Sequence, residues 1–328
     1  ATGRRTGAVR SPISEADITV APLDFEGAIR SLRSTGVVLL RGAVGRGVIE
    51  QVRQATVRAF ERLPQVAPTG GPAAKELMRL SMIGPGLTDG FSELTEMARR
   101  VVECGVGKPI VELYLGGRLI FDTSTLRFRS HRPSRTLSYV PLHQDAAFTA
   151  QDRSWINFWV PLSPCGEVAP GLEIYPLPEP KFFPHVDDPS PGGYPMGFIR
   201  DEALASYPHP LAPVEPIFEP GDLLLFDGFC PHRTIERPGM TQTRYSFEFR
   251  SSSENSQGPR ADGPRQERRT ARARRWAPNT SARSRPPSLA RYMARSACCT
   301  STMGSSMEPS SREIPALAVS CSVRLRIW

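Results

Sequence analysis

The stretch VPLHQDAAF, residues 140–148, decides how the rest of the chain is interpreted. In an extended strand, side chains two positions apart point to the same face, so His143 and Asp145 share a face and Gln144 points away. A second histidine, His232, comes much later in the chain. Two imidazoles and one carboxylate form the facial triad that binds non-haem Fe(II) and leaves coordination positions open. We therefore predict that His143, Asp145 and His232 are metal ligands.

The other three histidines stand in less suitable surroundings. His131 lies among arginines, and His185 and His209 fall in a proline-rich region. We interpret these three as non-ligands.

Length and composition indicate a globular protein. With 328 residues, the chain can bury a substantial core as one large domain or two small ones. No apolar run approaches the roughly 18 residues of a membrane-spanning helix, so we expect no membrane partner. Six cysteines are scattered without a C-x-x-C pair, which fits a reducing cytoplasm. We predict a cytoplasmic protein that acts on a small-molecule substrate; no sequence signal indicates its oligomeric state.

The formal net charge of +8 would favour a nucleic-acid binder if it were spread over the chain. Residues 251–328 hold 14 arginines, no lysine and five acidic residues, which give +9, so residues 1–250 carry −1. The basic character belongs to the C-terminal segment. We therefore do not expect residues 1–250 to bind nucleic acid.

Helical periodicity dominates the first part of the chain, and strand patterns dominate the second. Apolar residues fall at helical spacing over residues 24–32, 44–63, 73–82 and 91–104, and a short apolar strand fits 37–40. This order predicts a mainly β protein with flanking helices (α+β), in which a helical layer packs on a β-sandwich or barrel. The later predicted strands are 118–129, 136–142, 155–162, 171–175, 213–218, 222–226, 232–236 and 241–250.

Changes of composition divide the chain into segments. We predict a flexible lead-in at residues 1–20 and one domain at residues 21–250. Residues 176–216 contain eleven prolines, and loops of this length inside a domain are often functional covers. We interpret the insertion as a partly ordered lid, with a passive surface loop as the alternative.

Residues 251–328 are rich in Ser, Arg, Pro and Ala and lose apolar periodicity, so their composition predicts disorder. Three origins fit this segment: a nucleic-acid-binding tail, a passive tail, or the out-of-frame translation of a GC-rich gene. The chain holds 38 arginines and three lysines, as a GC-rich coding sequence would give. We favour the third origin.

The last predicted strand contains RYSFEFR, residues 244–250. Period two places Arg244, Ser246 and Glu248 on one face and three aromatic side chains on the other. If the aromatic face is buried, Arg244 points into the barrel, where its charge requires an anion such as a dicarboxylate. The alternative is a solvated face on which Arg244 pairs with Glu248 or another surface acid.

Taken together, these residues resemble the Fe(II)/2-oxoglutarate-dependent oxygenases, and more narrowly their phytanoyl-CoA hydroxylase-like (PhyH) branch. The resemblance rests on HQD at 143–145, on His232, and on RYS at 244–246. GVVLLRG at 36–42 and WINFWVPL at 155–162 also resemble the first strand and the core strand of that family. The resemblance implies a double-stranded β-helix, a jelly-roll or cupin-like barrel with an N-terminal helical layer.

The resemblance covers roughly residues 20–250 and implies Fe(II), 2-oxoglutarate and O2 as metal, cosubstrate and oxidant. It implies hydroxylation of an aliphatic carbon of a small molecule or secondary metabolite, with release of succinate and CO2. Related halogenases replace the carboxylate at the position of Asp145, so halogenation is not expected. The implied residues are His143, Asp145 and His232 for iron and Arg244, Ser246, Trp159 and Thr125 for 2-oxoglutarate; Arg127, His131, Gln151 and Arg153 are candidate substrate contacts.

Two alternatives remain open at the level of sequence. A cupin-like isomerase or hydrolase would use the same three metal ligands without 2-oxoglutarate, and would leave Arg244 and Ser246 without a role. A binding role of the arginine-rich tail would instead make residues 251–328 the functional part, with affinity for nucleic acid that falls steeply with salt.

Overall fold

The computed structural model describes residues 11–66, 81–84, 88–133, 139–149, 153–186 and 197–255. These residues belong to one compact unit. Four parts of the chain on which the sequence analysis made predictions lie outside the described residues. They are most of the predicted helix at 73–82, the candidate Gln151, residues 187–196 of the proline-rich insertion, and residues 256–328.

Helix α2 (Phe25–Thr35) forms where the apolar spacing predicts a helix. The Asp24 side chain accepts a hydrogen bond from the Gly27 amide at 2.8 Å and so caps the N-terminus. Gly36 ends the helix in the left-handed conformation, with φ at 76°. The apolar face of α2 is buried in the main hydrophobic core.

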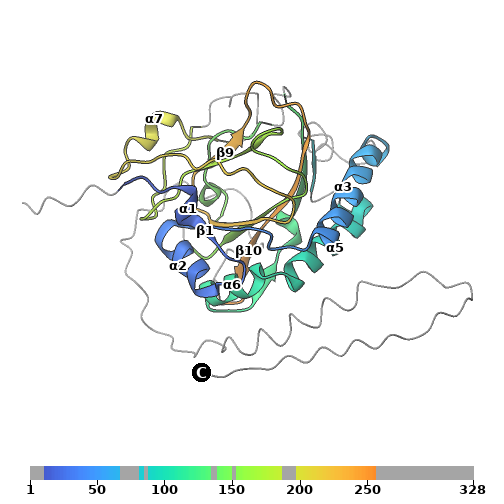
Figure 1. The fold of residues 1–328 in the computed structure, drawn as a ribbon, viewed down its shortest axis with the longest axis horizontal. Helices are drawn as coiled ribbons and strands as arrows, with labels where there is room; N and C mark the ends of the chain where they lie inside the picture. The colour runs from blue at the N-terminus through green and yellow to red at the C-terminus, as the bar shows by residue number, and fades with distance from the viewer. Residues whose placement is uncertain are drawn as a thin grey trace, which may run out of the picture. The chain divides into compact units, whose positions relative to one another are not determined.

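Three further helices contribute to the same core. Helices α3 (Arg46–Val66) and α5 (Ser92–Cys104) lie side by side (Figure 1). Helix α6 (Gly107–Leu115), which the sequence analysis did not predict, contacts α2 and α5. The shorter helices are α1 (Glu15–Ile18) and α7 (Asp201–Leu204), with 3-10 turns η2 (Thr88–Phe91), η3 (Thr123–Thr125) and η5 (Asp145–Ala147).

The described strands form two sheets. An eight-stranded sheet has the order β1-β2-β8-β6-β10-β5-β3, and β4 pairs with the end of β10. All of its pairs are antiparallel except β1 with β2. A second sheet consists of antiparallel β7 and β9. The bounds are β1 Thr19–Val20, β2 Val37–Leu40, β3 Met82–Ile83, β4 Leu119–Phe121, β5 Arg127–His131, β6 Ile156–Pro161, β7 Gly171–Ile174, β8 Leu223–Asp227, β9 His232–Ile235 and β10 Arg244–Ser253.

Strand β10 follows the predicted alternation. Phe247 and Phe249 are fully buried and pack with side chains of α2, α3, α5 and α6 in the main core. On the opposite face, Arg244 and Ser246 are also buried, with 1% and 0% of their surface exposed. The alternative of a solvated face on which Arg244 pairs with Glu248 is therefore wrong, because Arg244 is almost completely buried and Glu248 pairs with Arg129.

Strand β8 is apolar on both sides because two cores enclose it. Leu223 and Leu225 belong to the main core, while Leu224 and Phe226 belong to a second cluster that includes side chains of β7. A strand buried on both faces reads as a continuous apolar run, as observed in the sequence. The second cluster joins the eight-stranded sheet to the β7–β9 pair.

The structure corrects four predictions, two of domain boundaries and two of strands. Residues 15–20, expected in a flexible lead-in, form α1 and β1, and Ile18 is fully buried. Of the predicted strand at 136–142, the described residues 139–142 are not a strand, and 213–218 forms only isolated bridges. Pro141, Pro213 and Pro216 lack the amide hydrogen that a strand ladder needs. Strand β10 continues to Ser253, beyond the predicted domain end at 250.

The described parts of the proline-rich insertion pack against the HQD stretch. Phe183, Ile199 and Tyr207 form a third hydrophobic cluster with Leu142, and the Ile199 amide donates to the Leu142 carbonyl at 2.7 Å.

Among the helices of the described residues, none is long and apolar enough to cross a membrane.

Candidate metal centre

The backbones of His143 and His232 form an isolated antiparallel bridge. Each amide donates to the other carbonyl at 3.0 Å, and the ring centroids lie 4.2 Å apart. The Nδ1 atom of His143 lies 2.9 Å from the Pro141 carbonyl, and that of His232 lies 3.0 Å from the Cys230 carbonyl. A carbonyl only accepts, so each Nδ1 carries the hydrogen, and each Nε2 keeps a lone pair for a metal.

Asp145 begins the η5 turn, which is fastened to the loop before His232. The Ala146 amide donates to the Gly228 carbonyl at 2.8 Å. Oδ1 of Asp145 lies 3.8 Å from Nε2 of His143 and accepts from Nη2 of Arg250, while its Oδ2 accepts from Nδ2 of Asn157. Both oxygens of the Asp145 carboxylate thus accept hydrogen bonds, and the carboxylate lies beside His143 and His232.

Electrostatics keep His143 and Asp145 in the protonation states that a metal needs. Burial and then the neighbouring His232 lower the pKa of His143 to about 3, so its imidazole is neutral at neutral pH. Burial alone would raise the pKa of Asp145, but Arg250 and the two histidines outweigh it, and the pKa lies below its ordinary value. The ligand atoms of His143, Asp145 and His232 all lie within 4.8 Å of one another. This set could hold one divalent metal ion with positions open.

The three predicted ligands line a cavity of about 230 Å³ that also reaches Arg244. The Arg244 guanidinium donates from Nη1 to the Gly171 carbonyl at 3.0 Å and lies 5.8 Å from the centre of the Trp159 ring. Burial lowers the pKa of Arg244 to about 10, so it remains charged at neutral pH. The structure therefore places a buried cation and the three predicted metal ligands in one cavity.

Several buried polar atoms near Arg244 have no hydrogen-bond partner among the described residues. They include Nε of Arg244, Oγ of Ser246 and Oγ1 of Thr234. Each such atom costs about 1–3 kcal/mol unless a partner is supplied. Arg244 and Thr234 line the cavity, so a ligand with carboxylate oxygens fits these donors. The residues present therefore fit an acidic cosubstrate at this end of the cavity.

Trp159 and Thr125, predicted to contact the cosubstrate, have structural contacts in the described residues. Trp159 is fully buried against Phe218 and beneath Arg244. The Thr125 hydroxyl accepts from the Arg250 amide at 2.9 Å, which ties η3 to β10, and Thr125 lines the cavity. Direct contact of either residue with a cosubstrate stays a prediction.

The four candidate substrate contacts lie in different places. Arg127 lines the cavity. His131 is buried opposite Arg244 in the β5–β10 register and is not among the described lining residues; burial and Arg244 lower its pKa to about 2. Gln151 lies outside the described residues.

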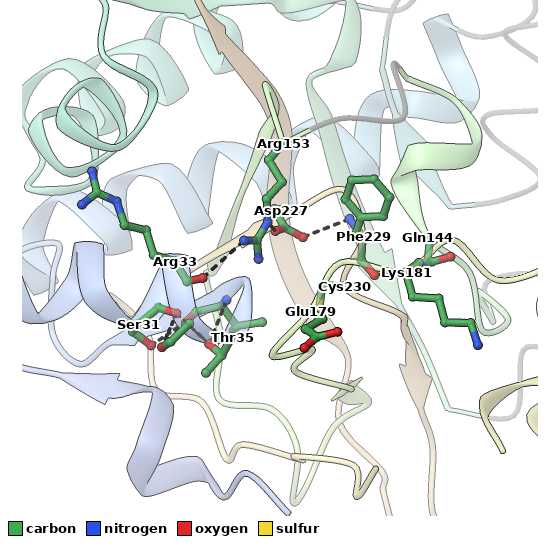
Figure 2. Close-up of polar contacts among 12 residues, drawn as sticks. Ser31, Arg33, Thr35, Gln144, Arg153, Glu179, Lys181, Asp227, Phe229 and Cys230 are labelled. Carbon is green, nitrogen blue, oxygen red and sulfur yellow. Dashed lines mark hydrogen bonds and ion pairs between the residues drawn. The ribbon is translucent and has the colours of Figure 1, made fainter. Parts of the chain in front are cut away.

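Arg153 is directed to the buried carboxylate of Asp227 instead of the described cavity lining (Figure 2). Its Nε donates to Asp227 Oδ2 at 2.6 Å, and the Phe229 amide donates to Oδ1 at 3.0 Å. Asp227 thereby holds the turn that leads to His232. Arg153 therefore supports this turn and is not among the described residues that line the cavity.

Gln144, between the two ligands of the HQD triplet, connects three segments of the chain. Its buried side chain donates to the carbonyls of Lys181, at 2.7 Å, and Phe229, and accepts from the Phe183 amide at 2.8 Å. Lys181 and Phe183 belong to the proline-rich insertion, and Phe229 belongs to the turn before His232. The residue that points away from the metal ligands therefore holds both neighbouring loops.

Three residues at the centre were missed by the sequence analysis. Thr234 follows His232 at a spacing of two on β9, and Arg250 continues the period-two face of Arg244, so strand periodicity could have indicated both. Asn157 is the polar residue in the otherwise apolar strand β6, and it lies opposite Arg250 in the register. A buried polar residue in such a strand indicates a specific partner.

Comparisons with known proteins bear on the fold. No protein-family model matches the sequence, and no curated protein matches it. The crystal structure of EctD from S. alaskensis with 2-oxoglutarate and 5-hydroxyectoine matches with a TM-score of 0.50 at 14% identity, covering 76% of this chain and 85% of that chain.

Two further structures match more weakly. They are AviO1 from Streptomyces viridochromogenes (TM-score 0.49, 15% identity, 71% of this chain and 97% of that chain) and SnoN, a non-heme alpha ketoglutarate dependent epimerase from nogalamycin biosynthesis (TM-score 0.48, 16% identity, 71% and 82%). At such identities only the fold is comparable. We conclude that the described chain shares the fold of EctD and carries, on that fold, a buried His–Asp–His set that could bind a metal.

Proposed function

We propose that the chain is an Fe(II)- and 2-oxoglutarate-dependent oxygenase of the phytanoyl-CoA hydroxylase-like family, with its sheets closed into a double-stranded β-helix. Its reaction is the hydroxylation of an aliphatic carbon of a small molecule, with release of succinate and CO2. One observation carries the proposal: a single cavity contains both the His143–Asp145–His232 set and the buried, incompletely paired Arg244.

Each residue has a chemical task in this proposal. Nε2 of His143 and of His232 and the Asp145 carboxylate hold Fe(II). Bound Fe(II), with 2-oxoglutarate and O2, supplies the oxidant, and one oxygen atom goes to succinate and the other to the substrate. Arg244 holds a carboxylate of 2-oxoglutarate through charge-assisted hydrogen bonds, and the hydroxyl of Thr234 or Ser246 adds a further donor.

The neighbouring residues restrict what the centre does. Asp145 is a carboxylate held by Asn157 and Arg250, so a third protein ligand is present and we propose hydroxylation rather than halogenation. The walls of the cavity exclude bulk water, because the three ligand residues are each less than 10% exposed. This protects a reactive oxidant from side reactions. The described parts of the insertion, joined to Gln144, act as the cover in this proposal.

An anaerobic titration tests the function. Fe(II) and 2-oxoglutarate are added to the full chain, and the visible charge-transfer band of the chelate is recorded. We expect the band in the wild type and a right-shifted 2-oxoglutarate titration in Arg244→Met. Metal binding without any band would instead support a cupin-like metalloprotein that does not use 2-oxoglutarate.

A further inference from the structure

Asn157 is a buried polar residue between two residues of the main core. It lies on β6 with 6% of its surface exposed, and its neighbours Ile156 and Phe158 belong to that core. Side chains alternate along a strand, so Asn157 faces the opposite side, where it lines the cavity that contains the predicted metal ligands. A buried amide is unfavourable unless it is hydrogen-bonded, so a polar partner in the cavity accounts for its presence.

The partner of Asn157 is the carboxylate of Asp145. Nδ2 of Asn157 donates to Oδ2 of Asp145; the amide oxygen cannot donate, so the contact fixes the orientation of the amide. Both backbones are held in place, because β6 pairs with β8 and β10 on its two sides, and the Ala146 amide donates to the Gly228 carbonyl at 2.8 Å. The hydrogen bond therefore joins two fixed parts of the chain.

The two oxygens of the Asp145 carboxylate have different surroundings. Oδ1 lies 3.8 Å from Nε2 of His143 and accepts from Nη2 of Arg250. A carboxylate oxygen has two lone pairs, so Oδ1 can accept from Arg250 and still bind a metal beside His143. Oδ2 is held by Asn157 on β6. This contact fixes the rotation of the carboxylate about its Cβ–Cγ bond, and a rotation that turned Oδ2 toward the same metal ion would break it.

The number of Asp145 oxygens that bind the metal decides how many coordination positions stay open. Carboxylates bind metal ions through one oxygen or through both. An octahedral Fe(II) ion held by two histidines and one carboxylate oxygen keeps three open positions, and chelating 2-oxoglutarate takes two of them. A second oxygen of Asp145 would take the last one. A position for a further ligand therefore remains only if Asp145 binds through a single oxygen.

We propose that Asn157 is a positioning residue that restricts Asp145 to one coordinating oxygen, Oδ1, and so reserves a coordination position for O2. This inference rests on the proposed function and adds how the centre keeps that position open. Arg250 does not replace Asn157 in this role, because it donates to the other oxygen. Without the amide donor, Oδ2 is free to bind the metal as well.

Nitric oxide tests the proposal, because it is a small gaseous ligand that binds Fe(II) at an open position. The full chain is loaded anaerobically with Fe(II) and saturating 2-oxoglutarate, and the iron–nitrosyl is followed by electron paramagnetic resonance as nitric oxide is added. We expect the wild type to bind it. Asn157→Leu has the same heavy-atom skeleton without the donor; it should keep the charge-transfer band of the chelate but bind nitric oxide about tenfold or more weakly.

A second donor-free variant and a matched control complete the test. Asn157→Val, with a side chain that suits a strand, should show the same loss as Asn157→Leu. Asn255→Leu is the control, because Asn255 is exposed and donates to the Gly116 carbonyl at 2.8 Å; its affinity for nitric oxide should equal that of the wild type.

Two results would overturn the proposal. One is nitric oxide binding as tight as in the wild type in both donor-free variants. The other is loss of Fe(II) binding in both, since Asn157 would then be needed to hold the metal and not to keep a position open. Absence of the chelate band in the wild type is a separate signal, recorded before nitric oxide is added, and would refute the proposed function itself.

Discussion

Replacement of Gln144 by leucine tests the idea that this side chain holds the proline-rich insertion and the turn before His232 in place beside the predicted metal ligands. Leucine keeps a similar volume but makes none of the three hydrogen bonds to Lys181, Phe183 and Phe229. The Phe183 amide is then buried without a partner, at about 1–3 kcal/mol, and two partly buried carbonyls lose a donor. We expect the free energy of unfolding to fall by about 2–4 kcal/mol.

Urea denaturation of the metal-free protein measures this loss through the midpoint and the slope. Gln54→Leu is the matched control, because Gln54 is an exposed glutamine that donates to Glu50 at 2.8 Å, and we expect a change within about 0.5 kcal/mol. A Gln144→Leu variant as stable as the Gln54→Leu control, at an unchanged slope, would refute the reasoning.

A second measurement separates positioning from stability. The Gln144 side chain holds the Phe229 carbonyl, three residues before His232, so its loss should weaken Co(II) binding by about tenfold, as for other residues that orient metal ligands. Gln144→Glu should be worse than leucine, because a carboxylate would face two carbonyl oxygens. Unchanged Co(II) affinity in both variants would show that Gln144 is purely structural.

Three further predictions follow from the same contacts. Asp145→Ala should abolish succinate formation, and measurable turnover would remove Asp145 from the metal site. Arg244→Ala should chiefly raise the 2-oxoglutarate concentration that half-saturates the enzyme, with little change in metal affinity. Arg153→Met should cost on the order of 3 kcal/mol of stability at neutral pH, because the buried Asp227 carboxylate loses its cation. Burial already raises the pKa of Asp227, and loss of the Arg153 cation should raise it further. Asp227 of the variant should therefore take up its proton at a higher pH than Asp227 of the wild type, and the penalty of Arg153→Met should shrink as pH falls toward the wild-type pKa; a penalty independent of pH would contradict this.

Much of the sheet could be predicted because its strands carry strong local patterns. The apolar run of β8 and the alternation of β10 each fit one secondary structure only. The stretches at 139–142 and 213–218 look equally strand-like in composition, but their prolines leave too few amides for a ladder. Helix α6 was missed because it is short and contains glycine and proline near its start.

The candidate site likewise has residues that could be predicted from the sequence and contacts that could not. The spacing of His143, Asp145, His232 and Arg244 is visible in the sequence, and the structure places these residues around one cavity. The contact between Arg153 and Asp227 could not be predicted from the sequence, because Asp227 lies 74 residues away at the end of β8. Partners so distant in sequence are set by tertiary packing, for which a single sequence carries no periodic signal.

The register of β10 links the stability of the fold to its chemistry. Side chains alternate with period two, so a shift of one residue would exchange the aromatic face with the face that carries Arg244 and Arg250. Burial of Phe247 and Phe249 contributes about 1.5–3 kcal/mol each, and the shifted register would lose this while burying two guanidinium groups in the apolar core. The hydrophobic packing against the helices therefore disfavours a one-residue shift, which would turn both arginines away from the predicted metal ligands. A substitution that weakens this packing, such as Phe249→Ala, should consequently impair 2-oxoglutarate binding as well as stability, although Phe249 donates no hydrogen bond to any ligand.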